Sequence, residues 1–153
     1  MPSHGGKIEM VFSKILVPFD ASTYSIKAFK TALDIAKKHG SEIHVLTCLE
    51  KENLGAWYKD KRINKKIVDD ARNYAKEVLS KLGQTGKTAG ISVTIHIKET
   101  KSISKEITEF AVAKKINLIV IGSHGQTGFN RMILGSVSNK VSQIAKCPVL
   151  IVK

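Results

Sequence analysis

The sequence NLIVIGSHGQTGFNRMILGS, residues 117–136, decides the fold. It opens with NLIVIG, an apolar run typical of a central strand that is buried on both faces of a parallel sheet. Four of the chain's 11 glycines follow within residues 122–136. Glycine is entropically costly, so such a cluster indicates a backbone that turns sharply or that another group approaches closely. The segment VSNKVSQIAK comes next and is predicted to form a helix.

Outward from this stretch, strand-like and helix-like patterns alternate along the chain. The strands are short apolar runs or strict alternations, whereas the helices repeat apolar residues every three or four positions. This order predicts an α/β fold, a doubly wound parallel sheet with helices on both faces and right-handed crossovers. In such sheets ligands bind beyond the carboxyl ends of the strands, which is where the glycine loop begins. The predicted strands are 14–19, 42–48, 91–98, 117–122 and 149–152, and the predicted helices begin near Ser22, Ile63, Ile103 and Val137.

The segments between these elements carry their own signals. Gly40 is expected to end the first helix, and residues 49–60 are expected to form a loop. The segment GQTGKTAG, residues 83–90, is expected to break the second helix. ISVTIHIK, residues 91–98, then alternates strictly, which predicts a strand with one buried face near the edge of the sheet.

The composition predicts one globular domain inside the cell. Hydrophobic residues make up 42% and charged residues 25% of the 153 positions, which is ordinary for such a domain. No apolar run approaches the ~20 residues that span a bilayer. MPSHGGKIE lacks the apolar segment of a secretory signal, and two cysteines are too few for a disulfide framework. We therefore expect a cytoplasmic protein with a disordered leader or expression remnant at residues 1–10 and one domain at residues 11–153.

The net charge is the one unusual bulk property. Lys and Arg number 25 against 13 Asp and Glu, which gives +12 at pH 7. Such a field attracts phosphorylated ligands, nucleic acid and acidic surfaces alike, without choosing among them. The sequence contains no recognisable nucleic-acid reader motif. A basic nucleic-acid-associated protein is therefore an alternative function, and no membrane partner is expected.

Two familiar phosphate-binding motifs do not fit this sequence. GKT at residues 86–88 resembles the end of a Walker A loop, but Lys81 stands where the first glycine belongs. That segment also follows a predicted helix, whereas a Walker A loop follows a strand. Residues 122–128 have glycines spaced GxxGxxG, not GxGxxG, and they come too late in the chain for a dinucleotide fingerprint.

The spacing that remains is Gly122-x2-Gly125-x9-Gly135-Ser136. Gly122 and Gly125 would turn the chain off the strand and expose backbone N–H groups. Gly135 would let phosphate oxygens reach the backbone where the fourth helix begins. Ser136 is a natural N-cap or a hydroxyl donor to a phosphate, and a helix N-terminus adds about half a positive charge. The loop is therefore predicted to bind phosphate, and a flexible surface loop with incidental glycines is the alternative.

The segment GSHGQTGFNRMILGS, followed by VSNKVSQIAKCPVLIVK, resembles the C-terminal signature of the universal stress protein family. KILVPFDAS resembles the first strand and loop of that family, so the resemblance runs from about Ser13 to Lys153. The glycine spacing matches the nucleotide-binding branch at every fixed position. The resemblance implies a five-stranded parallel sheet of order 3-2-1-4-5, similar to adenine-nucleotide alpha-hydrolases. It also implies a homodimer that pairs through the last strand, about Val149–Val152.

The resemblance further implies ATP, or ADP or AMP, held between the first and fourth strands, with Mg²⁺ or Mn²⁺ bound through the phosphates. Asp20 is expected to reach the ribose, with helix capping as its alternative role. No residue is assigned a catalytic role. The phosphates are expected on Gly122, Gly125, Gly135 and Ser136, with Ser123, His124 and Val137 as further nucleotide-binding positions and with Val17, Pro18, Asp20 and Thr47 on the adenosine side.

The function expected from these features is a nucleotide-dependent switch or binding module in the stress response. Fast phosphoryl transfer needs a positioned base, a metal-binding acid and a charge-stabilising cation. The sequence offers glycines and a cap, which bind phosphates, without a constellation that activates water. At most slow ATP hydrolysis is expected. A slow ATPase or another adenine-nucleotide enzyme of the same fold group is the alternative, although no SGGxDS-type loop follows the first strand.

Overall fold

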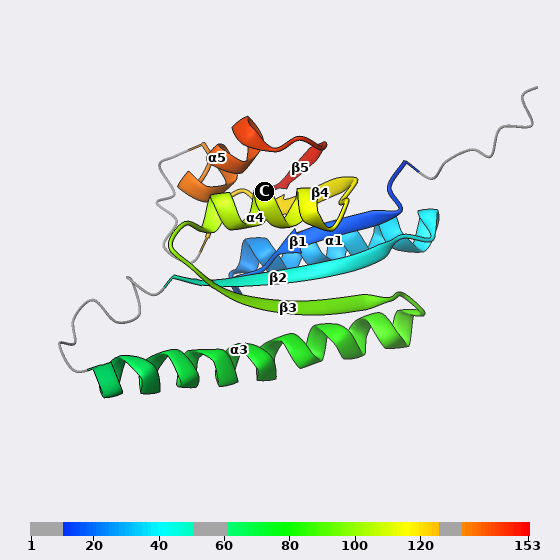
Figure 1. Ribbon diagram of the computed structural model, residues 1–153. Coiled ribbons are helices and arrows are strands. Elements are labelled where there is room, and N and C mark those ends of the chain that lie inside the picture. Colours follow the sequence, from blue (N-terminus) through cyan, green and yellow to red (C-terminus); the bar gives the residue numbers. More distant parts are fainter. Residues whose placement is uncertain (1–10, 51–60, 126–132) are drawn as a thin grey trace, which may run out of the picture.

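The computed structural model describes residues 11–50, 61–125 and 133–153. Within these ranges, five parallel strands form one sheet of order β3-β2-β1-β4-β5, which confirms the predicted fold (Figure 1). The predicted leader at residues 1–10, most of the loop predicted at 49–60 and Gly128 lie outside the described residues. The elements are β1 (Lys14–Pro18), α1 (Thr23–His39), β2 (Glu42–Glu50), α3 (Lys61–Ala89), β3 (Val93–Thr100), α4 (Ile103–Ala113), β4 (Leu118–Gly122), α5 (Ser136–Ile144) and β5 (Val149–Val152).

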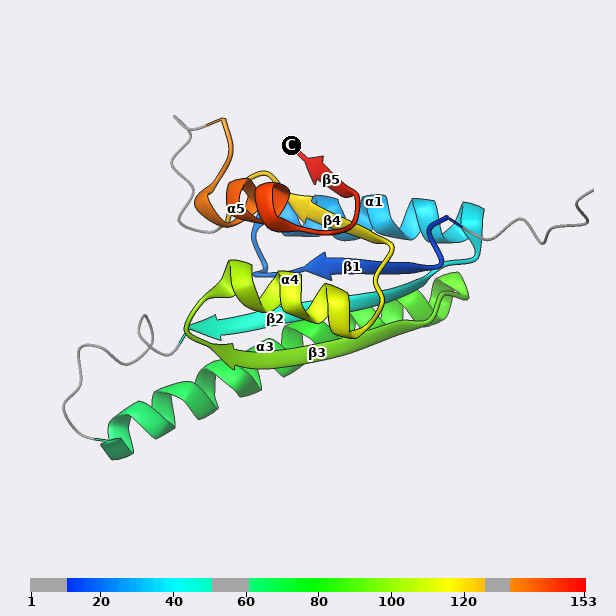
Figure 2. The ribbon, with the colours of Figure 1, turned by 45° about the horizontal axis from the view of Figure 1, so that its top comes forward.

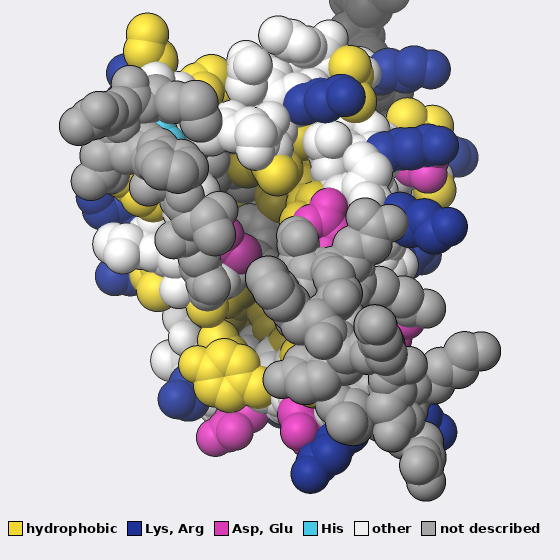
Figure 3. Space-filling model, turned by 90° about the vertical axis from the view of Figure 1, so that its left-hand side faces the viewer, with side chains coloured by type: hydrophobic (Ala, Val, Ile, Leu, Met, Phe, Trp, Pro, Cys, Tyr) yellow, Lys and Arg dark blue, Asp and Glu magenta, His cyan; other side chains and the backbone are white. Residues whose placement is uncertain are grey.

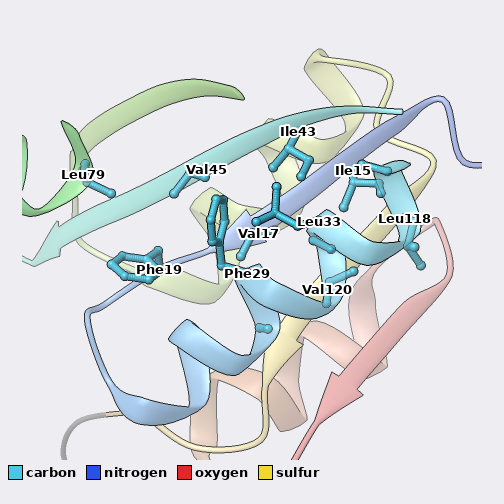
Figure 4. Close-up of a cluster of buried hydrophobic side chains, with 13 residues drawn as sticks. Ile15, Val17, Phe19, Phe29, Leu33, Ile43, Val45, Leu79, Leu118 and Val120 are labelled. Carbon is cyan, nitrogen blue, oxygen red and sulfur yellow. The ribbon is translucent and has the colours of Figure 1, made fainter. Parts of the chain in front are cut away.

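The helices cover both faces of the sheet. Figures 1 and 2 show α1 and α3 on one face and α4 and α5 on the other. Each face has its own apolar cluster, because strand residues alternate between the two sides. On the α1 and α3 face, Val17 and Val45 pack with Phe29 and Leu33 (Figure 4). On the other face, Leu16 belongs to the cluster of α4 and α5.

The first helix begins and ends as its sequence predicts. The Ser22 hydroxyl accepts a hydrogen bond from the Ser25 N–H at 3.1 Å, so Ser22 is the N-cap. At the other end, Gly40 adopts the left-handed conformation with φ of 67°, and its N–H bonds to the carbonyl of Ala36. The Ser22 cap thus starts α1 a few residues after the carboxyl end of β1.

The break predicted at residues 83–90 is wrong, because α3 continues to Ala89. Gly86 lies inside the helix, where a Cβ atom would overlap Cγ2 of Val93 on β3. The glycine thus lets the helix approach the sheet closely, and it does not interrupt the helix. The left-handed residue that ends α3 is Gly90, with φ of 72°.

The sheet has β3 and β5 as its outer strands within the described part of the chain. The prediction of a strand near the edge at residues 91–98 is therefore confirmed, although β3 itself is Val93–Thr100. The second strand extends past its predicted end to Glu50, where it pairs with Thr100. Among the residues that the structure describes, no helix has the length and apolar character needed to cross a membrane.

Candidate functional site

The candidate site lies at the carboxyl edge of the sheet, where β1 and β4 are neighbours. The chain leaves β1 toward α1 on one face and leaves β4 toward α5 on the other, as Figure 2 shows. The two connections therefore separate at this point, which is the place where open α/β sheets bind ligands. Figure 3 looks onto this edge, with acidic side chains near the middle of the view and Lys and Arg around its outline.

The turn after β1 is held by the Asp20 side chain. Its Oδ1 accepts a hydrogen bond from the Ser22 N–H at 2.9 Å, and Asp20 is exposed. Between them, Ala21 has φ of 65°. This left-handed conformation is unfavourable for any residue that has a Cβ atom. Strained backbone of this kind concentrates at functional sites. The capping alternative for Asp20 is resolved in favour of Ser22, which caps α1 itself.

Apart from Asp20, the predicted adenosine-side residues lie on β1 and β2. The side chain of Val17 is fully buried in the core, so only its backbone faces the edge of the sheet (Figure 4). Pro18 is buried as well. The Thr47 hydroxyl donates to the Phe19 carbonyl at 2.8 Å, which ties the end of β2 to the segment after β1. These residues therefore contribute backbone groups to the edge of the sheet, because their side chains are buried or already hydrogen-bonded.

Gly122, at the end of β4, is required by the first turn of α1. A Cβ atom on Gly122 would lie 2.7 Å from Cβ of Tyr24 and 2.8 Å from its backbone carbon. Real side chains do not tolerate such approaches. Close packing of α1 thus explains this glycine without any ligand.

The two ends of the glycine loop are joined through one carbonyl group. The Ser123 carbonyl accepts hydrogen bonds from the Gly135 N–H and from the Ser138 hydroxyl, both at 2.7 Å. A Cβ atom on Gly135 would lie 3.2 Å from Cα of His124 and 3.3 Å from this carbonyl oxygen. Gly135 is therefore needed where the returning chain passes the departing chain.

Gly125 and Asp20 come together although they are distant in sequence. A Cβ atom on Gly125 would lie 2.9 Å from Oδ2 of Asp20, so the backbone of the loop faces this carboxylate. The structure thereby brings the β1 turn and the glycine loop to the same spot, as the nucleotide-site prediction requires.

The start of α5 differs from the prediction that Ser136 is its N-cap. The N-cap is Gly135, with φ of −66° and ψ of 162°, and no side-chain hydrogen bond from the described residues caps it. Ser136 is exposed and is the first helical residue, while the Val137 side chain packs into the core. The first N–H groups of a helix have no partner within the helix. The start of α5 is thus a place where an anion can accept hydrogen bonds from the backbone N–H groups of Ser136 and Val137.

His124 is held from two sides. Its Nδ1 lies 2.9 Å from the hydroxyl of the buried Ser123, and its ring centroid lies 5.2 Å from that of Tyr24. Sequence reasoning missed Tyr24 and Ser138. The sequence carries no local signal for either, because one acts across a helix–loop contact and the other bonds to a carbonyl 15 residues away.

The described residues bring phosphate-binding features together without a metal-binding cluster. Among them, no group of three or more His, Cys, Asp or Glu side chains is placed to hold a metal ion. Asp20 supplies a carboxylate beside Gly125, and His124, close to Gly135 at the start of α5, supplies an imidazole. Such an arrangement can bind an anion and a hydroxyl group.

Comparisons with known proteins place this chain in a family. The model of the universal stress protein family matches residues 12–153. Universal stress protein MJ0531 of Methanocaldococcus jannaschii is 33% identical over 152 residues, which cover 95% of this chain and 84% of that protein. The chain belongs to the universal stress protein family.

Solved universal stress proteins share the fold. UspA from Lactobacillus plantarum superposes with a TM-score of 0.84 at 24% identity, covering 93% of this chain and 98% of that chain. A universal stress protein from Archaeoglobus fulgidus in complex with dAMP gives a TM-score of 0.65 at 25% identity, covering 94% of this chain and 100% of that chain. The strand order and helix placement of this universal stress protein are thus those of the family.

Proposed function

We propose that this protein is a cytoplasmic universal stress protein whose domain, residues 11–153, binds ATP or a related adenine nucleotide. It acts as a nucleotide-dependent switch or binding module. One observation carries the proposal. The start of α5, which no described side chain caps, the glycine loop and Asp20 lie at the carboxyl edge of the sheet, where the chain leaves the neighbouring strands β1 and β4 toward opposite faces. The complex of the A. fulgidus protein with dAMP supports an adenine nucleotide as the ligand.

The predicted residues around the start of α5 and the turn after β1 have tasks in this proposal. The N–H groups of Ser136 and Val137 bind phosphate oxygens, helped by the partial positive charge at the start of α5. The loop backbone at Ser123, His124 and Gly125 lies beside them, and the Asp20 carboxylate reaches a ribose hydroxyl. Mg²⁺ or Mn²⁺ is held through the phosphates.

Binding, not rapid turnover, is the proposed task. Phosphoryl transfer at ~1–100 s⁻¹ uses a positioned base together with acids that hold the metal and cations that stabilise charge. Of these parts, the described site offers one carboxylate, Asp20, and one imidazole, His124. We therefore propose hydrolysis far slower than that of kinases.

The placement of the phosphates is tested by Ser136→Pro. Proline is favoured at the first position of a helix, and the extended Gly135 suits a residue before proline, so the fold is retained. The change removes the Ser136 N–H. A hydrogen bond to a charged group is worth about 1.5–3 kcal/mol, so ATP affinity measured by calorimetry is expected to fall about 10- to 100-fold.

Ser136→Ala is the matched control, because it removes the hydroxyl and keeps the N–H. The proline variant is expected to bind ATP at least about tenfold more weakly than the alanine variant. Equal ATP affinities in two folded variants would show that the phosphates do not lie on the start of α5.

We also propose that two copies pair through β5, Val149–Val152. Within the described part of the chain β5 is an outer strand, and the exposed fraction of the Leu150 side chain is 39%. An apolar outer strand favours pairing with a copy of itself.

A further inference from the structure

Two histidines face each other on the sheet, away from the candidate nucleotide site. His44 on β2 and His96 on β3 have stacked rings, and Nδ1 of His44 lies 3.0 Å from Nε2 of His96. The other nitrogen of His44, Nε2, lies 2.9 Å from Oε1 of Glu42. These atoms form a continuous hydrogen-bonded line from Glu42 through His44 to His96.

The hydrogen atoms in this line can be placed by counting donors. The ionised Glu42 carboxylate only accepts, so Nε2 of His44 carries a hydrogen. A neutral His44 then has a bare Nδ1, which accepts from Nε2–H of His96. With both rings neutral, the hydrogen atoms therefore have one arrangement, in which each facing nitrogen takes part in a hydrogen bond.

The pair lies beneath α4, among both apolar and charged groups. The Phe110 ring contacts His96 with a centroid distance of 4.8 Å and His44 with one of 6.4 Å. Three lysines are the charged neighbours. Lys14 of β1 lies 3.9 Å from Glu42, Lys98 of β3 forms an ion pair with Glu106 of α4 at 3.3 Å, and Lys114 follows α4. The Cys48 thiol on β2 stays neutral, because burial and the Glu106 charge raise its pKa to about 12.

The line accepts one added proton without breaking. When the first proton binds Nδ1 of His96, the hydrogen on Nε2 of His96 can stay in place or move to Nδ1 of His44. In both states one N–H lies between the two facing nitrogens, and the positive charge is stabilised by Glu42. A second proton puts an N–H on both facing nitrogens. Two donors cannot remain 3.0 Å apart, so the rings must separate.

We propose that Glu42, His44 and His96 form an acid-sensitive latch that joins β2 to β3 beneath α4 and opens when both imidazoles are protonated. Opening removes the imidazole contacts of the Phe110 ring and loosens α4 from the sheet. The protein thereby responds to acidification at a place separate from the nucleotide site.

The direction of the pH dependence follows from His96. Burial, the neighbouring His44 and the ammonium groups of Lys114 and Lys98 lower the pKa of His96 below its ordinary value. The unfolded chain therefore binds the proton more readily than the folded chain. Stability is fully present above the ordinary histidine pKa of about 6.5 and is lost as the pH falls from there toward the lowered value.

His96→Gln tests the latch. The Gln side-chain amide donates to Nδ1 of His44 but does not titrate. The parent is expected to lose Tm between about pH 7.5 and about pH 5, with faster amide exchange in α4 and β3 after correction for the intrinsic rate. A tenfold change in the folded-to-unfolded ratio shifts the Tm of a chain this size by about 3–5 °C. Between the same two pH values, the Tm of the Gln variant is expected to fall by at least about 3–5 °C less than the Tm of the parent.

His39→Gln is the control, since His39 is an exposed histidine at the end of α1 that packs on Phe12. It is expected to keep the parent's loss of Tm in acid. NMR titration of the unmodified protein provides a second readout, in which the His44 and His96 rings respond together to the first proton. Independent titration of both rings at the ordinary pKa, or an equal loss of Tm in the parent and His96→Gln, would overturn the proposal.

Discussion

At the scale of single residues, the three glycines of the loop motif serve different purposes. Gly122 admits the first turn of α1, Gly135 lets the two ends of the loop pass, and Gly125 faces Asp20. From the sequence, Gly122 and Gly125 were expected to turn the chain and expose N–H groups, and Gly135 was expected to let phosphate oxygens approach the backbone. The contact with Tyr24 could not be predicted, because it depends on how α1 docks against β4.

Lys115 is a residue in a strained conformation outside the candidate site. It has φ of 55° where the chain leaves α4, and a left-handed conformation costs a residue with a Cβ atom about 1–2 kcal/mol. Lys115→Gly is therefore expected to raise the free energy of unfolding by about 0.5–1 kcal/mol, after the greater entropy of glycine in the unfolded chain is deducted. Chemical denaturation measures this change.

The neighbouring Lys114 provides the matched control. It is also an exposed lysine, but its φ of −92° is ordinary. Lys114→Gly is expected to leave the free energy of unfolding unchanged or lower it. If both variants were destabilised equally, backbone strain at Lys115 would be absent.

At the scale of elements, α3 shows where local sequence signals fail. Three glycines between residues 83 and 90 predicted a break, yet the helix includes the first two and ends at the third. Helix propensity is a weak signal that packing can override. Here the contact of Gly86 with Val93 on β3 outweighs the entropic cost of a glycine inside a helix. The remaining helix and strand positions followed from apolar periodicity, since each element buries one or both faces.

The two glycines inside α3 are expected to respond to alanine in opposite directions. At Gly86 a Cβ atom would overlap the stiff, β-branched Val93, and overpacking costs about 1–3 kcal/mol of stability. At Gly83 nothing among the described residues lies within 4 Å of a Cβ atom, so Gly83→Ala is expected to stabilise the helix by about 1 kcal/mol. Thermal and denaturant unfolding of both variants would distinguish these effects. Stabilisation by Gly86→Ala would contradict the close approach of α3 to β3.

At the scale of the whole molecule, the sequence predicted the class of fold more directly than the order of the strands. Alternating strands and helices require parallel pairing with crossovers. The order 3-2-1-4-5 was expected only from the family resemblance, because the alternation does not determine on which side of β1 each crossover returns. The position of the candidate site followed from this order, because the order makes β1 and β4 neighbours in the sheet.

Pairing of two copies through β5 is tested by Leu150→Lys. This side chain is on the outer strand and partly exposed, so the monomer tolerates lysine while a second copy would have to bury its charge. The parent is expected to be a dimer in light scattering coupled to size exclusion, and the variant is expected to be a monomer.

Ile26→Lys is the control, because Ile26 has the same exposed fraction, 39%, but lies on α1 and not on an outer strand. It is expected to remain dimeric. A dimeric Leu150→Lys protein, or a monomeric parent, would exclude pairing through β5.

The closure of the glycine loop on the Ser123 carbonyl has an evolutionary consequence. Because Gly135 and Ser138 both bond to this one oxygen, residues 124–134 depart from and return to a single fixed point. Each doubling of a loop's length costs only about 0.6 kcal/mol. Descendants of this chain can therefore exchange, lengthen or graft that segment and acquire new ligand preferences while the sheet beneath it is inherited unchanged.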